Sequence, residues 1–294
     1  MKILLTGAGG FTGRHFQVQA ERAGHEIVVL RADLTDQAAL EAELEGSTVD
    51  AVVHLAAISF VGHADENAFY SVNVLGTTRL LDVLGRLPKP PRRILLASSA
   101  NVYGNCECSP IAESQPPSPV NHYAMSKLAM EYMASTYLDR LNLLFARPFN
   151  YTGAGQDPSF VIPKLAEHFA RRAASVSLGN LDVEREFNDV RSVCEAYLLL
   201  LEHGEVGQVY NVCSGRPHSL REVIETFKRL TGHELDVIVD PAFVRPNELH
   251  RLCGDPTKLQ QLGANIGLPW KVFELEFTLK SVLDACVAKE RTIS

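Results

Sequence analysis

A glycine-rich loop between a strand and a helix constrains the fold of this chain most. Residues 2–6 (KILLT) form a short, largely apolar run without helical period, which predicts a buried strand. Residues 14–23 have a helical pattern, and glycines lie between the two segments. Glycine lets the backbone approach a pyrophosphate closely, and the helix N-terminus offers free N–H groups. This order favours a dinucleotide site over a ligand-free turn. We expect the cofactor to contact Gly7, Gly10, Phe11, Thr12 and Gly13.

Strand and helix patterns alternate over the first 150 residues. We expect further strands at 25–30, 50–55, 93–97 and 142–146, and helices at 36–44, 66–87 and 122–139, with Thr35 as a helix N-cap. Five or six such alternations predict an α/β protein with a doubly wound parallel Rossmann sheet. Beyond residue 150 the regularity loosens. There we expect helices at 160–172, 190–203, 219–231 and 271–289, and strands at 208–212 and 235–239.

The domain organisation follows from this change of regularity. We expect residues 1–150 and about 189–212 to form the Rossmann domain that binds the cofactor. Residues 151–188 and 213–294 then form a smaller C-terminal α/β lobe that binds the substrate, so the two are interleaved.

The end of the second strand bears on the choice between NAD(H) and NADP(H). An acidic residue at this position commonly holds the adenosine ribose hydroxyls, but here the position holds Arg31. A guanidinium can pair with a 2′-phosphate, which favours NADP(H), although a solvated arginine fits the sequence about equally well. Asp33 and Leu34 follow too closely for a full helix between, and we expect them to line the adenine pocket. After the next strand, His54 reads as a satisfied core histidine, and the small residues beyond it leave room for a ligand.

A tyrosine and a lysine four residues apart lie in the helix expected at 122–139. This spacing puts the Tyr123 phenol and the Lys127 ammonium on one helix face. The ammonium should lower the pKa of the tyrosine and make the phenol usable in proton transfer. Two solvated side chains are the simpler interpretation of this pair alone. The glycine loop and the serines at 98 and 99 favour the catalytic one.

Composition excludes several classes of function. The net charge of −7 argues against a nucleic-acid partner, which needs a basic excess. The six cysteines have no Cys-x-x-Cys spacing, so we expect free thiols and no metal. Met1 and Lys2 lead straight into the first strand, which indicates no signal peptide, and no apolar run is long enough to span a bilayer. A cytoplasmic enzyme is the expectation.

Six motifs, in order, resemble one family. They are Gly7-x-x-Gly10-Phe11-x-Gly13, His54-Leu55-Ala56-Ala57, Asn73-Val74-Leu75-Gly76-Thr77, Ser98-Ser99-x-x-Val102-Tyr103-Gly104, Tyr123-x-x-x-Lys127 and Arg147-Pro148-Phe149-Asn150. Their order and spacing resemble the extended short-chain dehydrogenase/reductases, the NAD-dependent epimerase/dehydratase family that acts on nucleotide sugars. The resemblance covers essentially the whole chain. Residues 147–156, 159–162 and 210–215 are most similar to the GDP-4-keto-6-deoxy-D-mannose reductases of that family.

The resemblance implies a role for each motif residue. Tyr123 would exchange a proton with the sugar oxygen at C4, Lys127 would bind the nicotinamide ribose, and Ser99 rather than Ser98 would bind the same sugar oxygen. Further cofactor contacts would come from Leu55, Ala56, Ala57, Asn73 and Pro148. The substrate nucleotide would be held by Asn150, Lys164, Arg185, Arg245 and Glu248. Arg185 and Arg245 suit a pyrophosphate, although a solvated position fits each of them nearly as well. A homodimer through the helices 66–87 and 122–139 is also implied.

The implied activity is NAD(P)H-dependent reduction of a nucleotide-linked 4-keto-6-deoxyhexose at C4. GDP-4-keto-6-deoxy-D-mannose would give GDP-D-rhamnose or its 4-epimer, GDP-6-deoxy-D-talose. A nucleotide-sugar 4-epimerase is the main alternative, followed by a 4,6-dehydratase and a regulator that senses dinucleotide without turnover. The family's dehydratases carry acidic residues directly after the catalytic Ser or Thr, where this chain has Ala100 and Asn101. An intact Ser99–Tyr123–Lys127 set argues against a pure sensor.

Overall fold

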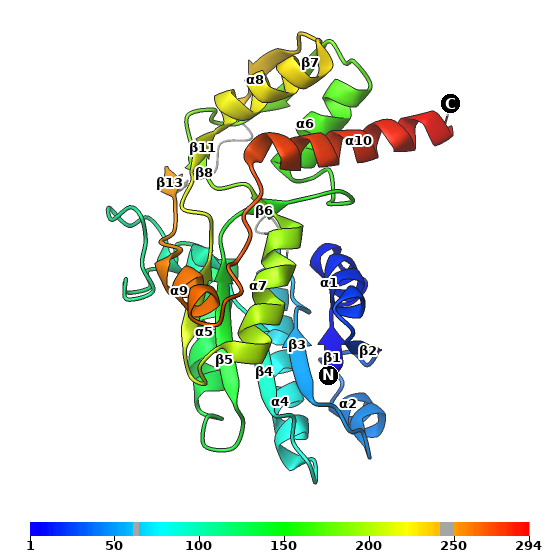
Figure 1. Ribbon diagram of the computed structural model, residues 1–294, viewed down its shortest axis with the longest axis vertical. Coiled ribbons are helices and arrows are strands. Elements are labelled where there is room, and N and C mark those ends of the chain that lie inside the picture. Colours follow the sequence, from blue (N-terminus) through cyan, green and yellow to red (C-terminus); the bar gives the residue numbers. More distant parts are fainter. Residues whose placement is uncertain (61–64, 242–249, 294) are drawn as a thin grey trace.

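The computed structural model describes residues 1–60, 65–241 and 250–293. Its main sheet has six strands, all parallel, in the order β10-β5-β4-β3-β1-β2 (Figure 1). The strands are β1 (Lys2–Thr6), β2 (Glu26–Val29), β3 (Ala51–His54), β4 (Arg93–Ala97), β5 (Leu143–Pro148) and β10 (Val209–Val212). This is the α/β parallel sheet that the alternation of elements predicted. A parallel sheet with crossover helices on its faces must bury both faces, so its strands are apolar throughout.

Helices cover both faces of the sheet. One face carries α1 (Phe11–Arg22), α7 (Val190–His203) and α9 (Thr257–Asn265). The other carries α2 (Gln37–Leu44), α4 (Thr77–Arg86) and α5 (His122–Ser135). Successive strand residues point to opposite faces: Ile3 and Leu5 pack on the α1 and α7 side, and Leu4 packs on the other. The core of this lobe is therefore two apolar layers separated by the sheet.

A smaller lobe lies above the carboxyl ends of the strands (Figure 1). Its apolar core joins α6 (Val161–Ala170), α8 (Leu220–Thr231) and α10 (Leu275–Ile293), with Phe169 and Phe227 stacked at a ring-centroid distance of 5.4 Å. Three small sheets complete the lobe and its junction with the main sheet. They pair β7 (Ser175–Leu178) with β12 (Asp236–Val239), β8 (Glu184–Arg185) with β11 (His218–Ser219) and β13 (Arg251–Leu252), and β6 (Tyr151–Thr152) with β9 (Asn188–Asp189).

Several local expectations need correction. The helix expected at 66–87 is α3 (Glu66–Tyr70), a π-helical turn (Ser71–Gly76) and α4 in succession, so its hydrogen-bond pattern changes from i→i+4 to i→i+5 in the middle segment. The N-cap of α2 is Asp36 and not Thr35, since the Asp36 carboxylate accepts a hydrogen bond from Ala39 N. The closing helix begins at Leu275, and α9 was not expected at all. No helix within the described ranges is long and apolar enough to cross a membrane.

Candidate active site

The glycine loop brings the start of α1 against the end of β3. Gly7 has φ +70°, and a Cβ there would lie 2.7 Å from Ala56 N. A Cβ on Gly13 would lie 2.1 Å from Gly7 O, so only glycine allows this packing. Gly10 is the N-cap of α1 and gives it no side-chain cap. The first-turn N–H groups and the positive end of the helix dipole are therefore suited to an anionic group such as a pyrophosphate.

Side chains from α1 fasten the glycine loop to the segment after β5. The Thr12 hydroxyl lies 2.8 Å from Tyr151 Oη, and the Phe11 ring stacks on the Tyr151 ring. His15 and Arg14 contact the carbonyls of Ala154 and Gly155 at 2.8 and 3.1 Å. The loop is thus held between the main sheet and the entry to the small lobe, although Phe11 and Thr12 were expected only as cofactor contacts.

His54 is a structural residue, as expected. It is 3% exposed, its Nδ1 lies 2.7 Å from Thr6 Oγ1, and its Nε2 lies 2.9 Å from Thr77 Oγ1. The Thr77 hydroxyl donates to Asn73 O, so His54 Nε2 carries the proton and Nδ1 accepts one from Thr6. Burial first, and then the nearby Lys127 charge, lower the pKa of His54 to about 3. The ring is neutral and holds β1 and β3 to the helix behind them.

Hydrogen bonds of Thr6 and Asn73 also fix the backbone segment expected to contact the cofactor. Leu55 N and Ala56 N both donate to Thr6 Oγ1 at 3.1 Å, which fixes the turn that leads to Ala57. Asn73, in the π-helical turn, binds both backbone groups of Ile58 and donates to Ser126 Oγ at 3.0 Å. Asn73 therefore joins this turn to α5, and a cofactor contact of its own stays a prediction.

Ser99, Tyr123 and Lys127 come together at the carboxyl ends of β4 and β5. Ser99 caps the short 3-10 helix 100–103, and its hydroxyl accepts from Asn101 N and Nδ2 at 3.2 and 3.1 Å. The Ser99 side chain also interacts with the Tyr123 phenol and lowers its pKa. Lys127, one turn along α5, donates to Ala97 O at 2.8 Å. Ser98 is buried, and its hydroxyl has no hydrogen-bond partner among the described residues.

The expected pKa direction of Tyr123 is wrong for the chain as described. Burial dominates and raises the pKa of the phenol, while the interaction with Ser99 lowers it only in part. Lys127 turns its ammonium to Ala97 O, and its own pKa falls to about 8, first because of burial and against the opposing effect of Glu131. A protonated phenol beside a charged lysine is thus the form present near neutral pH.

A buried ion pair lies behind the lysine. Arg147 binds Glu131 in bidentate fashion, with Nε–Oε1 2.9 Å and Nη2–Oε2 2.6 Å, and both residues are 5% exposed. The guanidinium lies 4.8 Å above the centre of the Tyr103 ring, and the Tyr103 hydroxyl donates to Asn211 Oδ1. This chain of contacts joins α5 to the turn that begins at Ser99. The Arg147 motif was noticed in the sequence, but its partner four residues after Lys127 was not.

The end of β2 has an unexpected arrangement. Arg31 N donates to both carboxylate oxygens of Glu43 at 2.9 and 3.2 Å, and Ala32 N donates to Oε2 at 2.5 Å. Asp33 accepts from the backbone and hydroxyl of Thr35, which lowers its pKa. Leu34 is buried against Gly76, where an added Cβ would lie 2.9 Å from Leu34 Cβ. Nothing in the sequence had singled out Glu43.

Three of the residues expected to hold the substrate nucleotide lie within the described ranges. Pro148 ends β5 and is buried, while Asn150 just beyond is exposed and its carbonyl accepts from Asn188 N at 3.0 Å. Lys164 on α6 donates to Ser177 O at 2.7 Å, and half-buried Arg185 on β8 donates to its neighbour's carbonyl. Arg245 and Glu248 lie outside the described residues.

Glu186 is a buried carboxylate that the sequence did not reveal. It is 0% exposed and accepts hydrogen bonds from Gly254 N, from Ser214 N and its hydroxyl, and from Asn188 Nδ2 at 2.5–3.1 Å. Four donors satisfy the charge without a cation. Glu186 therefore holds β8, the segment after β10 and the segment after β13 together beneath the small lobe.

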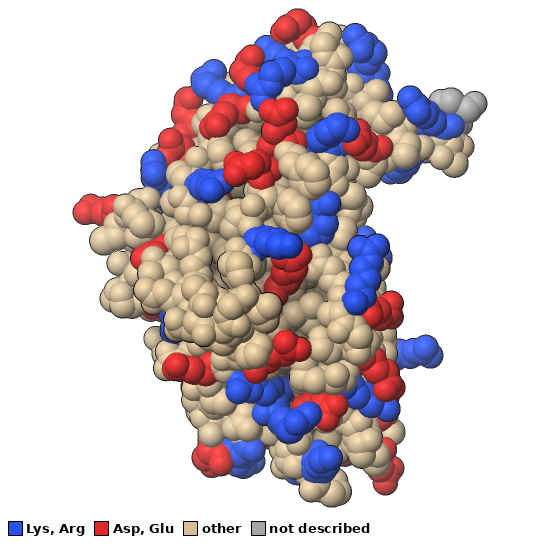
Figure 2. All heavy atoms as spheres, in the orientation of Figure 1, with Lys and Arg blue, Asp and Glu red and all other residues tan. Residues whose placement is uncertain are grey.

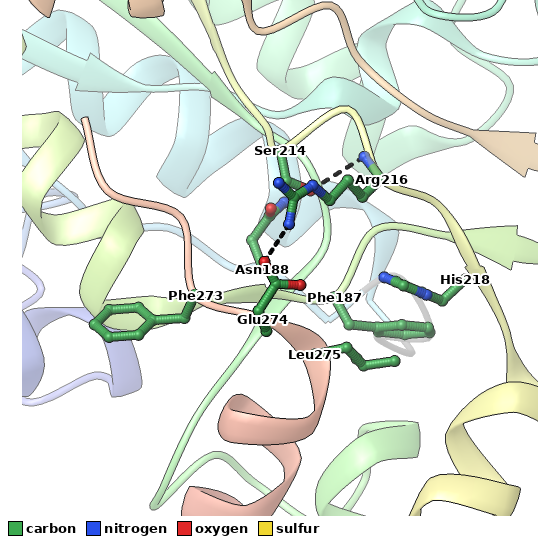
Figure 3. A pocket seen from close by; sticks show the side chains of 8 residues that line it. All are labelled: Phe187, Asn188, Ser214, Arg216, His218, Phe273, Glu274 and Leu275. Carbon is green, nitrogen blue, oxygen red and sulfur yellow. Dashed lines mark hydrogen bonds and ion pairs between the residues drawn. The ribbon is translucent and has the colours of Figure 1, made fainter. Parts of the chain in front are cut away.

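A pocket next to Glu186 is too small to be the substrate site. Figure 3 shows it between the segments 187–188, 214–218 and 273–275, with Arg216 and Glu274 paired across it at 2.5 Å. Its volume is about 10 Å³, room for one water at most. Its eight lining residues include none of those expected to hold the substrate. Figure 2 shows acidic and basic side chains interspersed over the face in view, without one large patch of either sign.

Comparison with known proteins gives a consistent picture. Residues 6–264 match the family model described as GDP-mannose 4,6 dehydratase. A GDP-6-deoxy-D-mannose reductase from Pseudomonas aeruginosa is 37% identical, with 98% of this chain and 96% of the relative covered. A GDP-6-deoxy-D-talose 4-dehydrogenase from Aggregatibacter actinomycetemcomitans is 33% identical, with coverages of 90% and 92%.

Solved structures agree in fold. The structure of RMD from Pseudomonas aeruginosa complexed with NADPH has a TM-score of 0.90 and 35% identity, with 98% of this chain and 99% of that chain covered. A UDP-glucose 4-epimerase from Thermus thermophilus complexed with NAD has a TM-score of 0.86 and 27% identity, with coverages of 97% and 99%. Both a reductase and an epimerase activity thus occur on this architecture.

Proposed function

Since the chain belongs to the extended short-chain dehydrogenase/reductase family and matches its GDP-mannose 4,6 dehydratase model, we propose that it reduces a nucleotide-linked 4-keto-6-deoxyhexose at C4. The reductant is NAD(P)H, and GDP-4-keto-6-deoxy-D-mannose is the substrate we favour. Its products are GDP-D-rhamnose or, with the opposite configuration at C4, GDP-6-deoxy-D-talose. The named activities of the two sequence relatives support this choice.

The observation that carries the proposal is the contact between Ser99 and Tyr123 beside Lys127 at the carboxyl edge of the sheet. Bound NAD(P)H supplies the hydride. The Tyr123 phenol, protonated because burial raises its pKa, donates its proton to the C4 oxygen as that oxygen gains charge. Ser99 holds the same oxygen. The Lys127 ammonium stabilises the phenolate that remains, and solvent returns the proton.

The residues after Ser99 support reduction over dehydration. Elimination of water needs a base for the C5 proton and an acid for the departing C6 hydroxyl. Ala100 is 1% exposed and cannot titrate, and Asn101 is an amide whose Nδ2 already donates to Ser99. The turn therefore lacks titratable side chains at both positions, although the family model takes its name from a dehydratase.

The glycine loop fits a dinucleotide. Gly7, Gly10 and Gly13 leave the uncapped start of α1 open to a pyrophosphate. The buried Ser98 hydroxyl is a further hydrogen-bonding group next to Ser99.

We propose that the chain favours NADP(H) over NAD(H), because Arg31 replaces the acidic residue that would repel a 2′-phosphate. Arg31→Asp should then lower the NADPH to NADH ratio of kcat/KM.

We propose that the small lobe holds the nucleotide of the substrate. The contacts assigned there are Asn150, Lys164, Arg185, Arg245 and Glu248. Lys164 on α6 and Arg185 on β8 place two cations in this lobe, which suits a pyrophosphate. We also propose an interleaved division into a cofactor domain (1–150 and about 189–212) and a substrate lobe (151–188 and 213–294), although α9 within the last segment packs on the main sheet.

The main alternative is a nucleotide-sugar 4-epimerase, which the Thermus thermophilus relative represents. Epimerisation uses the same hydride step at C4 and the same three side chains, so the site chemistry permits both. The two differ in cofactor balance, because an epimerase regenerates its cofactor in each cycle and a reductase consumes it.

The test supplies GDP-4-keto-6-deoxy-D-mannose with NADPH or NADH and follows cofactor absorbance together with the sugar product. Stoichiometric cofactor oxidation with a GDP-6-deoxyhexose as product is the expected result. Interconversion of 4-epimers without net oxidation would replace the proposal with the epimerase. Elimination of water from GDP-mannose would replace it with the dehydratase.

A further inference from the structure

Two consecutive backbone amides after β2 point at one carboxylate. Arg31 N and Ala32 N make three contacts of 2.5–3.2 Å with the oxygens of Glu43, a residue in the last turn of α2. Successive amides that converge on an anion form a small anion-binding site. Here the chain itself provides the anion.

The position of this anion-binding site relates it to cofactor binding. In a dinucleotide-binding sheet, the end of the second strand faces the adenosine ribose. An acidic group there holds the ribose hydroxyls of NAD, and an arginine accommodates the 2′-phosphate of NADP. This chain has Arg31 at the strand end and, on the amides of residues 31 and 32, the carboxylate of Glu43.

We propose that Glu43 is a cofactor-specificity residue that opposes Arg31, because its carboxylate occupies amide donors that a 2′-phosphate would use. This inference rests on the proposed function in one respect, namely that a nicotinamide dinucleotide binds at this edge of the sheet. NADP(H) must displace Glu43 and overcome the repulsion between phosphate and carboxylate. NAD(H) presents two neutral hydroxyls, which can donate to the carboxylate without moving it.

The two residues therefore act in opposite directions on one ligand group. The guanidinium attracts the phosphate, and the carboxylate competes with it for donors and repels it. Removing Glu43 frees both amides for the phosphate and removes a negative charge. Removing a carboxylate elsewhere on α2 changes the net charge equally but frees no amide at the end of β2.

The experiment compares the wild-type chain with Glu43→Ala and with Glu45→Ala. Glu45 is an exposed carboxylate at the C-cap of the same helix, so it is a matched control for charge. Dissociation constants of NADP⁺ and NAD⁺ are measured by titration calorimetry, without sugar substrate, so the readout does not depend on turnover.

Glu43→Ala should tighten NADP⁺ binding by roughly tenfold or more, because even one recovered hydrogen bond to a charged group contributes about that factor, and it should change NAD⁺ binding little or weaken it. Glu45→Ala should leave the ratio of the two constants unchanged. An unchanged ratio in Glu43→Ala, or an equal change in both variants, would overturn the role of Glu43 and leave the proposed reductase intact. Failure of all three proteins to bind either dinucleotide would overturn both the role of Glu43 and the proposed reductase function.

Discussion

Burial decides the protonation states in this site. Tyr123, Lys127 and His54 are each at most 8% exposed, and for each of them burial is the largest influence on the pKa. It raises the pKa of the phenol and lowers those of the ammonium and the imidazole, because a low-dielectric environment disfavours every charged form. Helical spacing predicts only the effect of the Lys127 charge, so the predicted direction of the Tyr123 pKa is wrong. The catalytic role of this pair stays a prediction.

Tyr123→Phe should abolish proton donation while it preserves the fold. The phenol hydroxyl is one small group, and the change removes its interaction with Ser99. We expect kcat to fall roughly 10²–10⁴-fold, the usual contribution of general acid catalysis. Cofactor affinity and the urea midpoint should stay close to wild type. Tyr132→Phe, at an exposed position of the same helix, is the control and should leave kcat unchanged.

Activity should decline as pH rises through the pKa of Lys127. Burial lowers this pKa to about 8, so the ammonium is present below that pH and is lost above it. The neutral amine no longer stabilises a phenolate, and kcat/KM should fall with the loss of one proton centred near pH 8. A pH profile of kcat/KM under saturating cofactor measures this. A rate that stays level across the same range would contradict an essential ammonium.

At the scale of elements, local pattern predicted most of the sheet and helices of the first 150 residues. Buried apolar strands such as Ile94–Leu96 and amphipathic helices can be recognised from the periodicity of their apolar residues and from flanking glycine or proline. The helix α9 was missed because it has only nine residues and two buried ones, and it depends on packing against β10 and α7. Contacts such as those of Glu43 with the amides of Arg31 and Ala32 join separate elements, so no periodicity within one element reveals them.

The ion pair between α5 and β5 should matter for stability. Breaking one partner of a buried pair leaves the other charge without compensation, which costs about 3–5 kcal/mol. Glu131→Gln should therefore lower the free energy of unfolding by about that amount in urea titrations. Replacing both partners, as Glu131→Leu with Arg147→Met, should cost less, because neither charge is then buried alone.

A surface pair provides the control for this prediction. Lys280 and Asp284 lie 2.7 Å apart on α10 with side chains about 60% exposed. Asp284→Asn should change the free energy of unfolding by less than about 1 kcal/mol, since such pairs are screened by solvent. Equal effects of Glu131→Gln and Asp284→Asn would show that burial does not distinguish the two pairs.

At the scale of the molecule, the chain crosses between its lobes several times. Strand β10 returns to the main sheet beside β5, and α9 follows it onto the same lobe from a region expected to belong to the substrate lobe. The return of residues 208–212 could be anticipated from their apolar pattern and the family resemblance. The Glu186 contacts that fix these crossings could not, because a lone Glu in a charged turn resembles a solvated one.

Exposed apolar side chains on neighbouring helices of the main lobe predict assembly of the chain. We expect a homodimer through the helices 66–87 and 122–139, which pack against each other and leave Leu75, Met125 and Tyr132 at 50%, 44% and 64% exposure. Burying such side chains against a second copy yields about 25 cal/mol for each Å² of apolar surface removed from water, and a specific interface removes about 1,200–2,000 Å² in total. Light scattering at micromolar concentration should give twice the chain mass of 32.3 kDa. Tyr132→Glu together with Met125→Glu should give monomers, because two charges would then be buried without partners. Ile238→Glu, at a residue of 53% exposure in the small lobe, should leave the dimer intact. A wild-type chain that scatters as a monomer would show that these apolar side chains face solvent in the active protein.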